Sequence, residues 1–294
     1  MLQEVLPPLN MKLLALRQDF KPMKFTTTTA DATTDATDFA LISQQIEGFN
    51  SADFLFGTAD AQDVTVSFWV RSSLTGTFCL TLLNSALNRS YVSEYTINAA
   101  NTWEYKTITV PGDTNGTWLT DNGSGLQVRF GITAGTDFQQ AAGSWGTGNA
   151  VGSSNQTQLL ETLNATWYVT GVQLEAGTVA TPFEHRSYGD ELAKCKRYFT
   201  NIGGTACHFR GTNSDSLGTT IPTPVQMRAT PSISNLSIGS CRMYNASGVN
   251  FGSASASVNA ANGAMYDIFV SGLSGVTDNA VGFINFTADL ASEL

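Results

Sequence analysis

The sequence predicts an all-β protein: a jelly-roll β-sandwich, then a short helix, then a second small β-sandwich. Apolar residues alternate at period two in several runs, most clearly over residues 64–70 and 126–132. Turn-forming residues separate these runs, and no long helical pattern lies between them. Only 13% of the residues are charged. This combination is typical of a turn-rich sandwich or jelly roll.

Further alternating runs extend the first β-body; they lie at residues 78–82, 91–97, 103–110 and 167–174. Residues 26–37 hold many threonines without apolar alternation, so we expect an exposed edge or a loop there. Three tryptophans fall within strand patterns and are most simply core residues; they are Trp69, Trp103 and Trp167.

A helix is predicted after the closing strand, over residues 185–202. Ser187 can cap it, Asp190 follows at capping-box distance, and Gly203 comes where the helix should end. The residues at helical spacing are Leu192, Cys195, Tyr198 and Phe199. After this helix we expect strands at 205–210, 219–228, 232–238, 242–245, 265–270 and 281–290.

The junction itself has a distinctive sequence. Residues 171–199 read GVQLEAGTVATPFEHRSYGDELAKCKRYF, which resembles a segment of many tailed-bacteriophage virion proteins, usually tail-fibre or other appendage proteins. Residues 39–78 and 95–118 are similar to the sandwich strands of the same proteins, and residues 221–234 resemble a strand entry in their terminal domains.

The resemblance implies a domain order. An N-terminal attachment segment (1–24), which departs from the family pattern, would precede a jelly-roll sandwich (25–184), a linker helix (185–202) and a C-terminal β-domain (203–294). It also implies a homotrimer in contact with other virion proteins, assembled in the host cytoplasm. The expected function is a non-enzymatic appendage component that contributes to recognition of host-surface glycan. The alternatives are a capsid-decorating or tail-connecting protein and, as a weaker one, a polysaccharide depolymerase.

Charge and hydropathy exclude several partners. The formal net charge is −9 and the pI about 4.6, so no basic surface is available to bind nucleic acid. No apolar stretch is long enough to span a bilayer, and the N-terminal segment lacks the features of a signal peptide. We therefore expect neither nucleic-acid binding nor membrane insertion.

No catalytic or cofactor motif is found. His185 and His208 belong to no catalytic or metal-binding pattern, and the four cysteines lack C-x-x-C spacing, so we expect free thiols. A glycosidase needs two carboxylates across a bound sugar. Acids on or beside strands that could serve are Glu94, Glu104 and Asp113, but nothing singles out two of them.

Glu47 and Glu175 could ligate a structural calcium ion, but neither has the spacing of a calcium loop. The alternative for Glu175 is a hydrogen bond in the turn beside Gly177. We expect no cofactor and no metal.

The candidate site lies in loops. Sugars stack on exposed aromatic rings while amides orient their hydroxyl groups. Trp145, in GSWGTGN, and Trp118, in NGTWLTDN, fit this description, with Asn149 and Asn122 as polar neighbours. The alternative is that each tryptophan packs back over an open end of the core.

Overall fold

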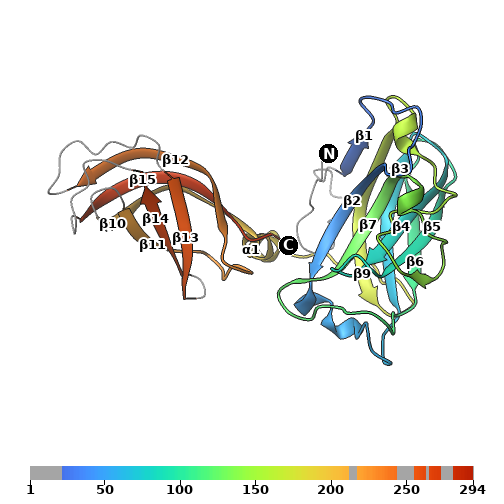
Figure 1. Ribbon diagram of the computed structural model, residues 1–294, viewed down its shortest axis with the longest axis horizontal. Helices are drawn as coiled ribbons and strands as arrows, with labels where there is room; N and C mark the ends of the chain where they lie inside the picture. The colour runs from blue at the N-terminus through green and yellow to red at the C-terminus, as the bar shows by residue number, and fades with distance from the viewer. Residues whose placement is uncertain (1–21, 212–216, 244–254, 263–264, 273–280, 294) are drawn as a thin grey trace. The chain divides into compact units, whose positions relative to one another are not determined.

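The computed structural model describes residues 22–211, 217–243, 255–262, 265–272 and 281–293. Within them the chain is built mainly from antiparallel strands (Figure 1), so the predicted all-β class is confirmed. The chain divides into two compact units, the first ending at Ser187 and the second running from Tyr188 to Glu293. Each unit has its own sheets and its own buried apolar residues.

The first unit contains a four-stranded antiparallel sheet with the strand order β1-β9-β3-β6. Its strands are β1 (Met23–Thr26), β3 (Val64–Ser72), β6 (Glu104–Val110) and β9 (Thr166–Ala176). Successive side chains of a strand point to opposite faces. Val64, Val66 and Phe68 of β3 are fully buried on the inner face, so Trp69 and Arg71 belong to the outer face.

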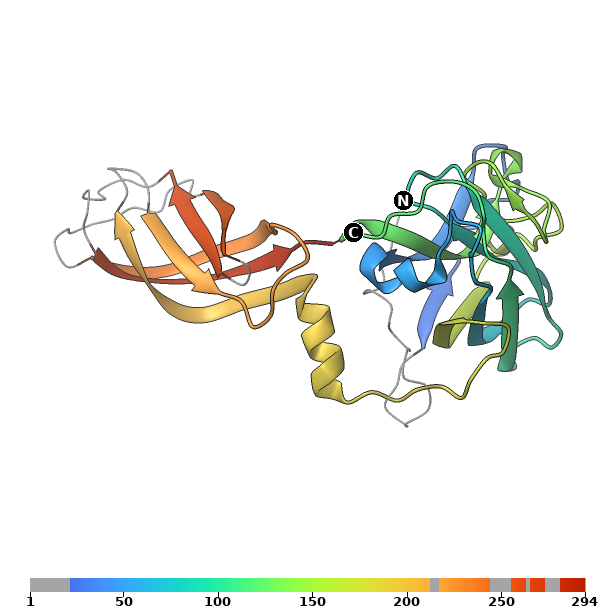
Figure 2. The same cartoon turned by 90° about the horizontal axis from the view of Figure 1, so that it is seen from below.

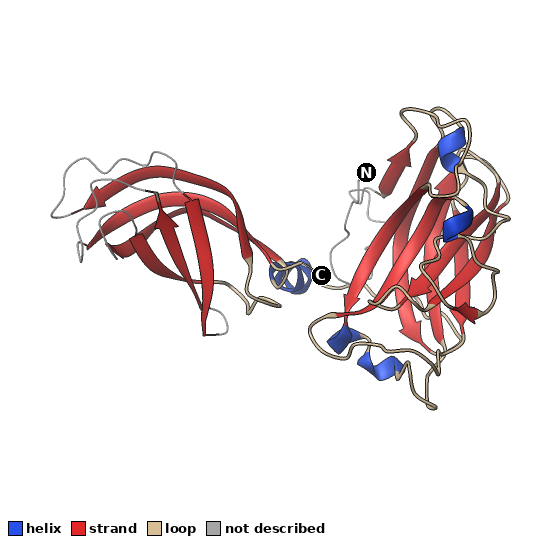
Figure 3. Ribbon diagram, in the orientation of Figure 1, coloured by secondary structure: helices blue, strands red, loops and turns tan. Residues whose placement is uncertain are grey.

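A second antiparallel sheet of the same unit has five strands in the order β2-β7-β4-β5-β8. They are β2 (Phe39–Glu47), β4 (Gly76–Leu83), β5 (Ser90–Ile97), β7 (Ser124–Ala134) and β8 (Trp145–Gly146). The long strands of both sheets overlap the runs predicted from alternation. The helical pieces of this unit are three-residue 3-10 turns in the connections between strands (Figure 3).

The apolar faces of the two sheets meet in an aromatic core. The ring centroid of Phe68 in β3 lies 5.0 Å from that of Phe130 in β7 and 5.2 Å from that of Tyr95 in β5. Trp167 of β9 lies 5.3 Å from Phe130. Fully burying a phenylalanine stabilises a fold by up to about 3 kcal/mol. These rings, which join strands of different sheets, therefore hold the unit together.

The outer face of the five-stranded sheet is covered by residues 135–158, which we call the roof segment. The thiol of Cys79 donates to Ser153 Oγ at 3.5 Å, and Thr81 Oγ1 donates to the Val151 carbonyl at 3.2 Å. The approach is so close that a Cβ on Gly131 would lie 2.5 Å from that carbonyl oxygen. This cover explains why β4 and β7 are buried on both faces.

The chain after β9 folds back along the outer face of the four-stranded sheet as residues 177–184, which we call the strap. The Gln173 amide donates to the carbonyl and the hydroxyl oxygen of Thr181 at 3.3 and 3.1 Å. The Glu175 carboxylate accepts from the backbone N–H and the hydroxyl of Thr181. Thr65 Oγ1 in β3 donates to the Gly177 carbonyl at 2.7 Å. The polar residues of the junction sequence thus fix its Ala-Thr-Pro turn.

The second unit begins with α1 (Tyr188–Lys196), which leads through two residues into β10, as Figure 2 shows. Six strands form one antiparallel sheet in the order β12-β15-β10-β11-β14-β13. They are β10 (Phe199–Gly211), β11 (Leu217–Pro222), β12 (Ser232–Met243), β13 (Ser255–Asn262), β14 (Met265–Ser271) and β15 (Val281–Ala291). The edge strands β12 and β13 approach each other, so the sheet curls towards closure.

The helix begins directly after Ser187, the predicted cap, but the prediction was too long at the C-terminal end. The helix ends at Lys196, and Phe199 opens β10, which runs through the glycine pair expected to end the helix. The carbonyl of Arg197 accepts from the Arg228 N–H at 2.8 Å, and that of Tyr198 accepts from the Ser292 N–H at 2.7 Å. In a longer helix these two carbonyls would accept intrahelical hydrogen bonds. Here they accept tertiary hydrogen bonds instead. The glycines fall instead at a register shift between Ile202 and Thr205.

The strand predictions for the second unit were partly wrong. β13 was missed because its Ser, Ala and Asn residues carry little strand signal, and pairing with β14 overrides that weakness. The expected strand at 219–228 ends at Pro222. The one at 232–238 and the first two residues of the one at 242–245 belong to the single strand β12, and residues 244 and 245 lie outside the described residues.

The expectation of free thiols is confirmed for Cys79 and Cys195. Burial raises the pKa of both thiols. Cys207 of β10 and Cys241 of β12 both stand opposite Ile284 of β15, one on each side. Their Cα atoms are thus two strand spacings apart, about 9–10 Å, which is too far for a disulfide between them.

Candidate functional site

Four aromatic side chains meet at one end of the first unit, and we call them the end cluster. They are Phe56, Tyr91, Trp118 and Trp145. The ring centroids of the two tryptophans lie 5.5 Å apart, and Phe56 lies 4.9 Å from Trp118. All four ring pairs are steeply inclined, at 64° to 81°, the edge-to-face geometry that aromatic pairs favour.

The cluster is assembled from four separate parts of the chain. Phe56 comes from the β2–β3 connection, Tyr91 from β5, Trp118 from the β6–β7 connection and Trp145 from β8. Each indole N–H donates to a backbone carbonyl: Trp145 to Pro111 at 2.7 Å and Trp118 to Asn115 at 3.0 Å. Both tryptophans remain half-buried. The rings are thus fixed in orientation and retain some exposed surface.

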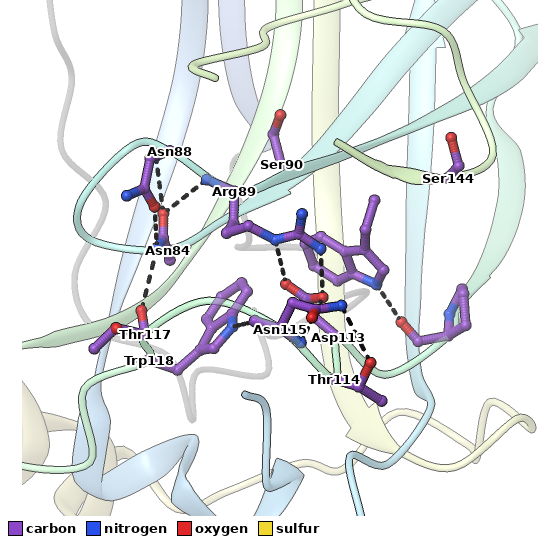
Figure 4. Close-up of polar contacts among 12 residues, drawn as sticks. Asn84, Asn88, Arg89, Ser90, Asp113, Thr114, Asn115, Thr117, Trp118 and Ser144 are labelled. Atoms are coloured by element: carbon purple, nitrogen blue, oxygen red, sulfur yellow. Dashed lines mark hydrogen bonds and ion pairs between the residues drawn. The ribbon is translucent and has the colours of Figure 1, made fainter. Parts of the chain in front are cut away.

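An ion pair supports the cluster from beside it (Figure 4). Arg89 Nε donates to Asp113 Oδ2 at 2.8 Å, and its second nitrogen donates to Oδ1 at 2.5 Å. The Asp113 side chain is 1% exposed and that of Arg89 16%. The hydrogen bond to Asp113 raises the pKa of Arg89. The guanidinium carbon also lies 6.0 Å from the Trp145 ring centroid, within cation–π range.

Asn84 joins the two loops that carry this ion pair (Figure 4). Its side-chain oxygen accepts from the backbone N–H groups of Asn88 and Arg89, both at 3.1 Å, and its amide nitrogen donates to the Thr117 carbonyl at 3.1 Å. A Cβ on Gly116 would lie 2.6 Å from Arg89 Cγ, and the positive φ of that glycine also favours a residue without a side chain. The loops are therefore held as a rigid support.

The structure brings together two of the four predicted site residues. Trp118 and Trp145 are in contact. Asn149 instead accepts a hydrogen bond from Arg129 of β7 at 2.5 Å, which ties its side-chain oxygen to the sheet below. Asn122 is an exposed residue in the turn before β7.

Arg129 is a buried cation held by amides. It is 7% exposed, and its Nε and one terminal nitrogen donate to Gln127 at 3.2 and 2.9 Å. Burial lowers the pKa of Arg129 to about 10. Among the described residues no carboxylate forms an ion pair with it. Its hydrogen bonds to Gln127 and Asn149 therefore offset the desolvation penalty of burying this charge between the sheet and the roof segment.

The three carboxylates that could serve in glycosidase chemistry have separate partners. Asp113 pairs with Arg89, Glu104 with Lys106 at 2.7 Å, and Glu94 accepts from the Asn155 amide at 3.1 Å. Desolvation acts to raise the pKa of Glu104, but hydrogen bonds from Lys106 and from residues 98–99 outweigh it and lower this pKa to about 2. A general acid requires a raised pKa, so Glu104 is unsuited to that role.

Sequence reasoning missed Phe56, Tyr91, Arg89 and Asp113 as parts of this site. The ion pair carries no local signal, because its members stand 24 positions apart. The prediction of core tryptophans is correct for Trp167, which is 0% exposed, but wrong for Trp69 and Trp103. Trp69 belongs to the outer face of the four-stranded sheet, since it follows the inward Phe68 and stands opposite Tyr105. Trp103 packs on the same face, 6.2 Å from Tyr168, which follows the inward Trp167.

No helix in the described ranges combines the length and apolar character that crossing a membrane requires. In the same ranges no three His, Cys, Asp or Glu side chains gather so as to hold a metal ion. Glu175 makes the turn hydrogen bonds to Thr181 described above, and Glu47 is buried at the end of β2. Searches with protein-family models and against curated proteins found no match.

Proposed function

We propose that the protein is a non-enzymatic virion component of a tailed phage, of the tail-fibre or other appendage class, and that it contributes to recognition of host-surface glycan. In this proposal residues 25–184 form a jelly-roll sandwich, and the second unit is a small β-sandwich or barrel. Of the predicted attachment segment 1–24, Met23 and Lys24 belong to β1 and residues 1–21 lie outside the described residues. The part before β1 would attach the chain to other virion proteins. The junction sequence at 171–199 and the antiparallel β-architecture support the phage setting.

The observation that carries glycan recognition is the end cluster with its fixed, half-exposed indoles. Both tryptophan rings are oriented by hydrogen bonds to backbone carbonyls. Exposed amide and hydroxyl side chains lie around them, namely Thr114, Asn115, Thr117 and Ser144 (Figure 4). Rigid aromatic faces beside hydrogen-bonding groups are the elements that recognise a pyranose.

Adsorption to host cells tests this function. The purified full chain should bind host cells, and Trp145→Ala and Trp118→Ala should each reduce binding by about tenfold, the effect of losing about 1.4 kcal/mol of stacking. Leu163→Ala is a matched control, because Leu163 is a 57% exposed apolar residue outside the cluster. It should leave binding unchanged. Thermal unfolding of every variant separates lost binding from lost fold.

A less disruptive variant tests the same site if the tryptophan variants fail to fold. Asn115 is exposed, and its side chain makes a hydrogen bond only to the neighbouring Thr114 among the contacts drawn in Figure 4. Asn115→Ala should therefore keep the fold and weaken adsorption. Full adsorption by folded Trp145→Ala and Asn115→Ala proteins would contradict the role of the end cluster.

A second candidate function is capsid decoration or connection of tail parts. The specific observation in its favour is that both indole N–H groups of the end cluster are already satisfied within the chain, as expected for tryptophans that only close the end of a core. Immunogold labelling of intact particles discriminates the two, since a receptor-binding protein should lie at the distal tail. Release of reducing ends from host polysaccharide tests the depolymerase alternative, and none is expected.

A homotrimer is part of this proposal, since fibre proteins close their subunit edges around an axis. Native mass measurement should give three times the chain mass of 31.3 kDa. A value near one chain would contradict it.

A further inference from the structure

A second group of aromatic side chains lies on the outer face of the four-stranded sheet, and we call it the outer aromatic face. Its members are Trp69, Trp103, Tyr105 and Tyr168. Trp69 and Tyr105 stand opposite each other in register with ring centroids 5.4 Å apart. Trp103 and Tyr168 lie 6.2 Å apart. Tyr105 is 46% exposed and both tryptophans are half-buried.

Two cations share this face. The guanidinium carbon of Arg71 lies 5.3 Å from the Tyr168 ring centroid, and the Lys24 ammonium lies 5.7 Å from it. The Arg71 Nε is buried and has no hydrogen-bond partner among the residues that the structure describes. In the described parts of the chain neither cation pairs with a carboxylate. Uncompensated positive charge is thus concentrated here on a chain whose net charge is −9.

The rest of the same outer face is already occupied. The strap lies over its other end, where Gln173 is fully buried and Thr65 is 1% exposed. In contrast, Tyr105 and Lys24 are exposed. Within the described residues, the end of the face where aromatic rings and cations coincide is therefore left open.

We propose that the outer aromatic face binds an acidic polysaccharide. Aromatic rings stack against the CH groups of pyranose rings, and the partly exposed guanidinium of Arg71 can donate to a uronate carboxylate. The Arg71 guanidinium, positioned over the Tyr168 ring, gives the anion a specific partner. This inference rests on the proposed function because the ligand is a glycan, but it uses none of the residues of the end cluster.

Titration of the full chain with polygalacturonate, with uncharged dextran as the comparison, tests the inference. Polygalacturonate should bind in low salt and weaken as salt rises, because screening acts on exposed charge pairs. Dextran should bind at least about tenfold more weakly. Equal binding of both polymers, or none of polygalacturonate, would overturn the proposal.

Variants locate the site. Arg71→Gln and Tyr105→Ala should each weaken polygalacturonate binding by about tenfold. Lys194→Gln removes an exposed cation of α1 in the second unit and should leave binding unchanged. Because Tyr105 is nearly half exposed, Tyr105→Ala should fold even if Arg71→Gln does not. Unchanged binding by the folded Tyr105→Ala protein would overturn the assignment.

The end-cluster variants separate this inference from the proposed function. Trp145→Ala should retain polygalacturonate binding while losing host adsorption. If Trp145→Ala loses both, the outer aromatic face is not a separate site. If the wild-type chain adsorbs to no host cell yet binds polygalacturonate through Arg71 and Tyr105, the proposed function fails and the inference stands. If the Tyr105→Ala protein has a smaller native mass than wild type but binds polygalacturonate equally well, the face is a contact with a second copy of the chain. That result would overturn the inference.

Discussion

The guanidinium of Arg89 and the carboxylate of Asp113 form a two-pronged ion pair, with N–H···O distances of 2.8 and 2.5 Å. It joins the β4–β5 connection to the β6–β7 connection, and the Trp145 ring packs beside it. The end cluster thus depends on an electrostatic contact between loops that are remote in sequence.

Asp113→Asn should destabilise the first unit by about 2–4 kcal/mol, because a largely buried guanidinium would lose its charged partner. Urea unfolding followed by tryptophan fluorescence measures this directly, since Trp118 and Trp145 lie beside the pair. Asp31→Asn, at an exposed loop position, is the control and should change stability by less than about 0.5 kcal/mol. If Asp113→Asn also destabilises the unit by less than about 0.5 kcal/mol, the ion pair does not hold the loops.

Asn149→Ala should cost about 1.5–3 kcal/mol, because it leaves a buried guanidinium nitrogen of Arg129 without its acceptor. Asn149 was predicted as a sugar-binding residue, and its contact with Arg129 gives it a structural role. Stability of Asn149→Ala and its adsorption to host cells are to be measured together. Asn122→Ala, which alters an exposed turn residue, serves as comparison and should change stability little. Undiminished stability of Asn149→Ala would contradict this role.

The strands of the first unit could be predicted because period-two alternation records burial of one face directly, as in β3 and β7. The location of Trp69 could not be predicted in the same way. Both faces of β3 are rich in large side chains, and alternation alone does not say which face meets the core. The pairing of Arg89 with Asp113 depends on loop conformations, which local sequence does not specify. Trp118 and Trp145 could be named from composition, but their mutual contact required the fold.

Glu104 should contribute to acid sensitivity. Its folded-state pKa of about 2 lies below its ordinary value of 4.5, so its stabilising effect is present above about pH 4.5 and is lost as the pH falls towards 2. Glu104→Gln should cost about 0.5–1 kcal/mol at neutral pH, because the pair with Lys106 lies at an edge strand where solvent screens it.

Unfolding of wild type and Glu104→Gln at a series of pH values from 7 to 3 checks this sign. The difference between the two proteins should shrink as the pH falls. A difference that stays constant, or that grows in acid, would show that Glu104 acts through packing and not through its charge. Asp60→Asn, which changes an exposed acid of the same unit, is the comparison measured over the same series.

Gln173→Ala should loosen the strap. The Gln173 side chain is fully buried and holds the strap at two points, donating to Thr181 and accepting from the Glu184 N–H at 3.3 Å. Its loss leaves two strap groups without partners, so we expect about 1–3 kcal/mol of local destabilisation.

Limited proteolysis should then cut residues 177–187 faster than in wild type, while the aromatic core around Phe68 stays protected, because local opening need not unfold the whole unit. Thr178→Ala, an exposed strap position, should leave the cleavage rate unchanged. Equal cleavage of Gln173→Ala and wild type would mean that Gln173 is not needed and that the Glu175 carboxylate and the hydroxyl groups of Thr65 and Thr109 hold the strap.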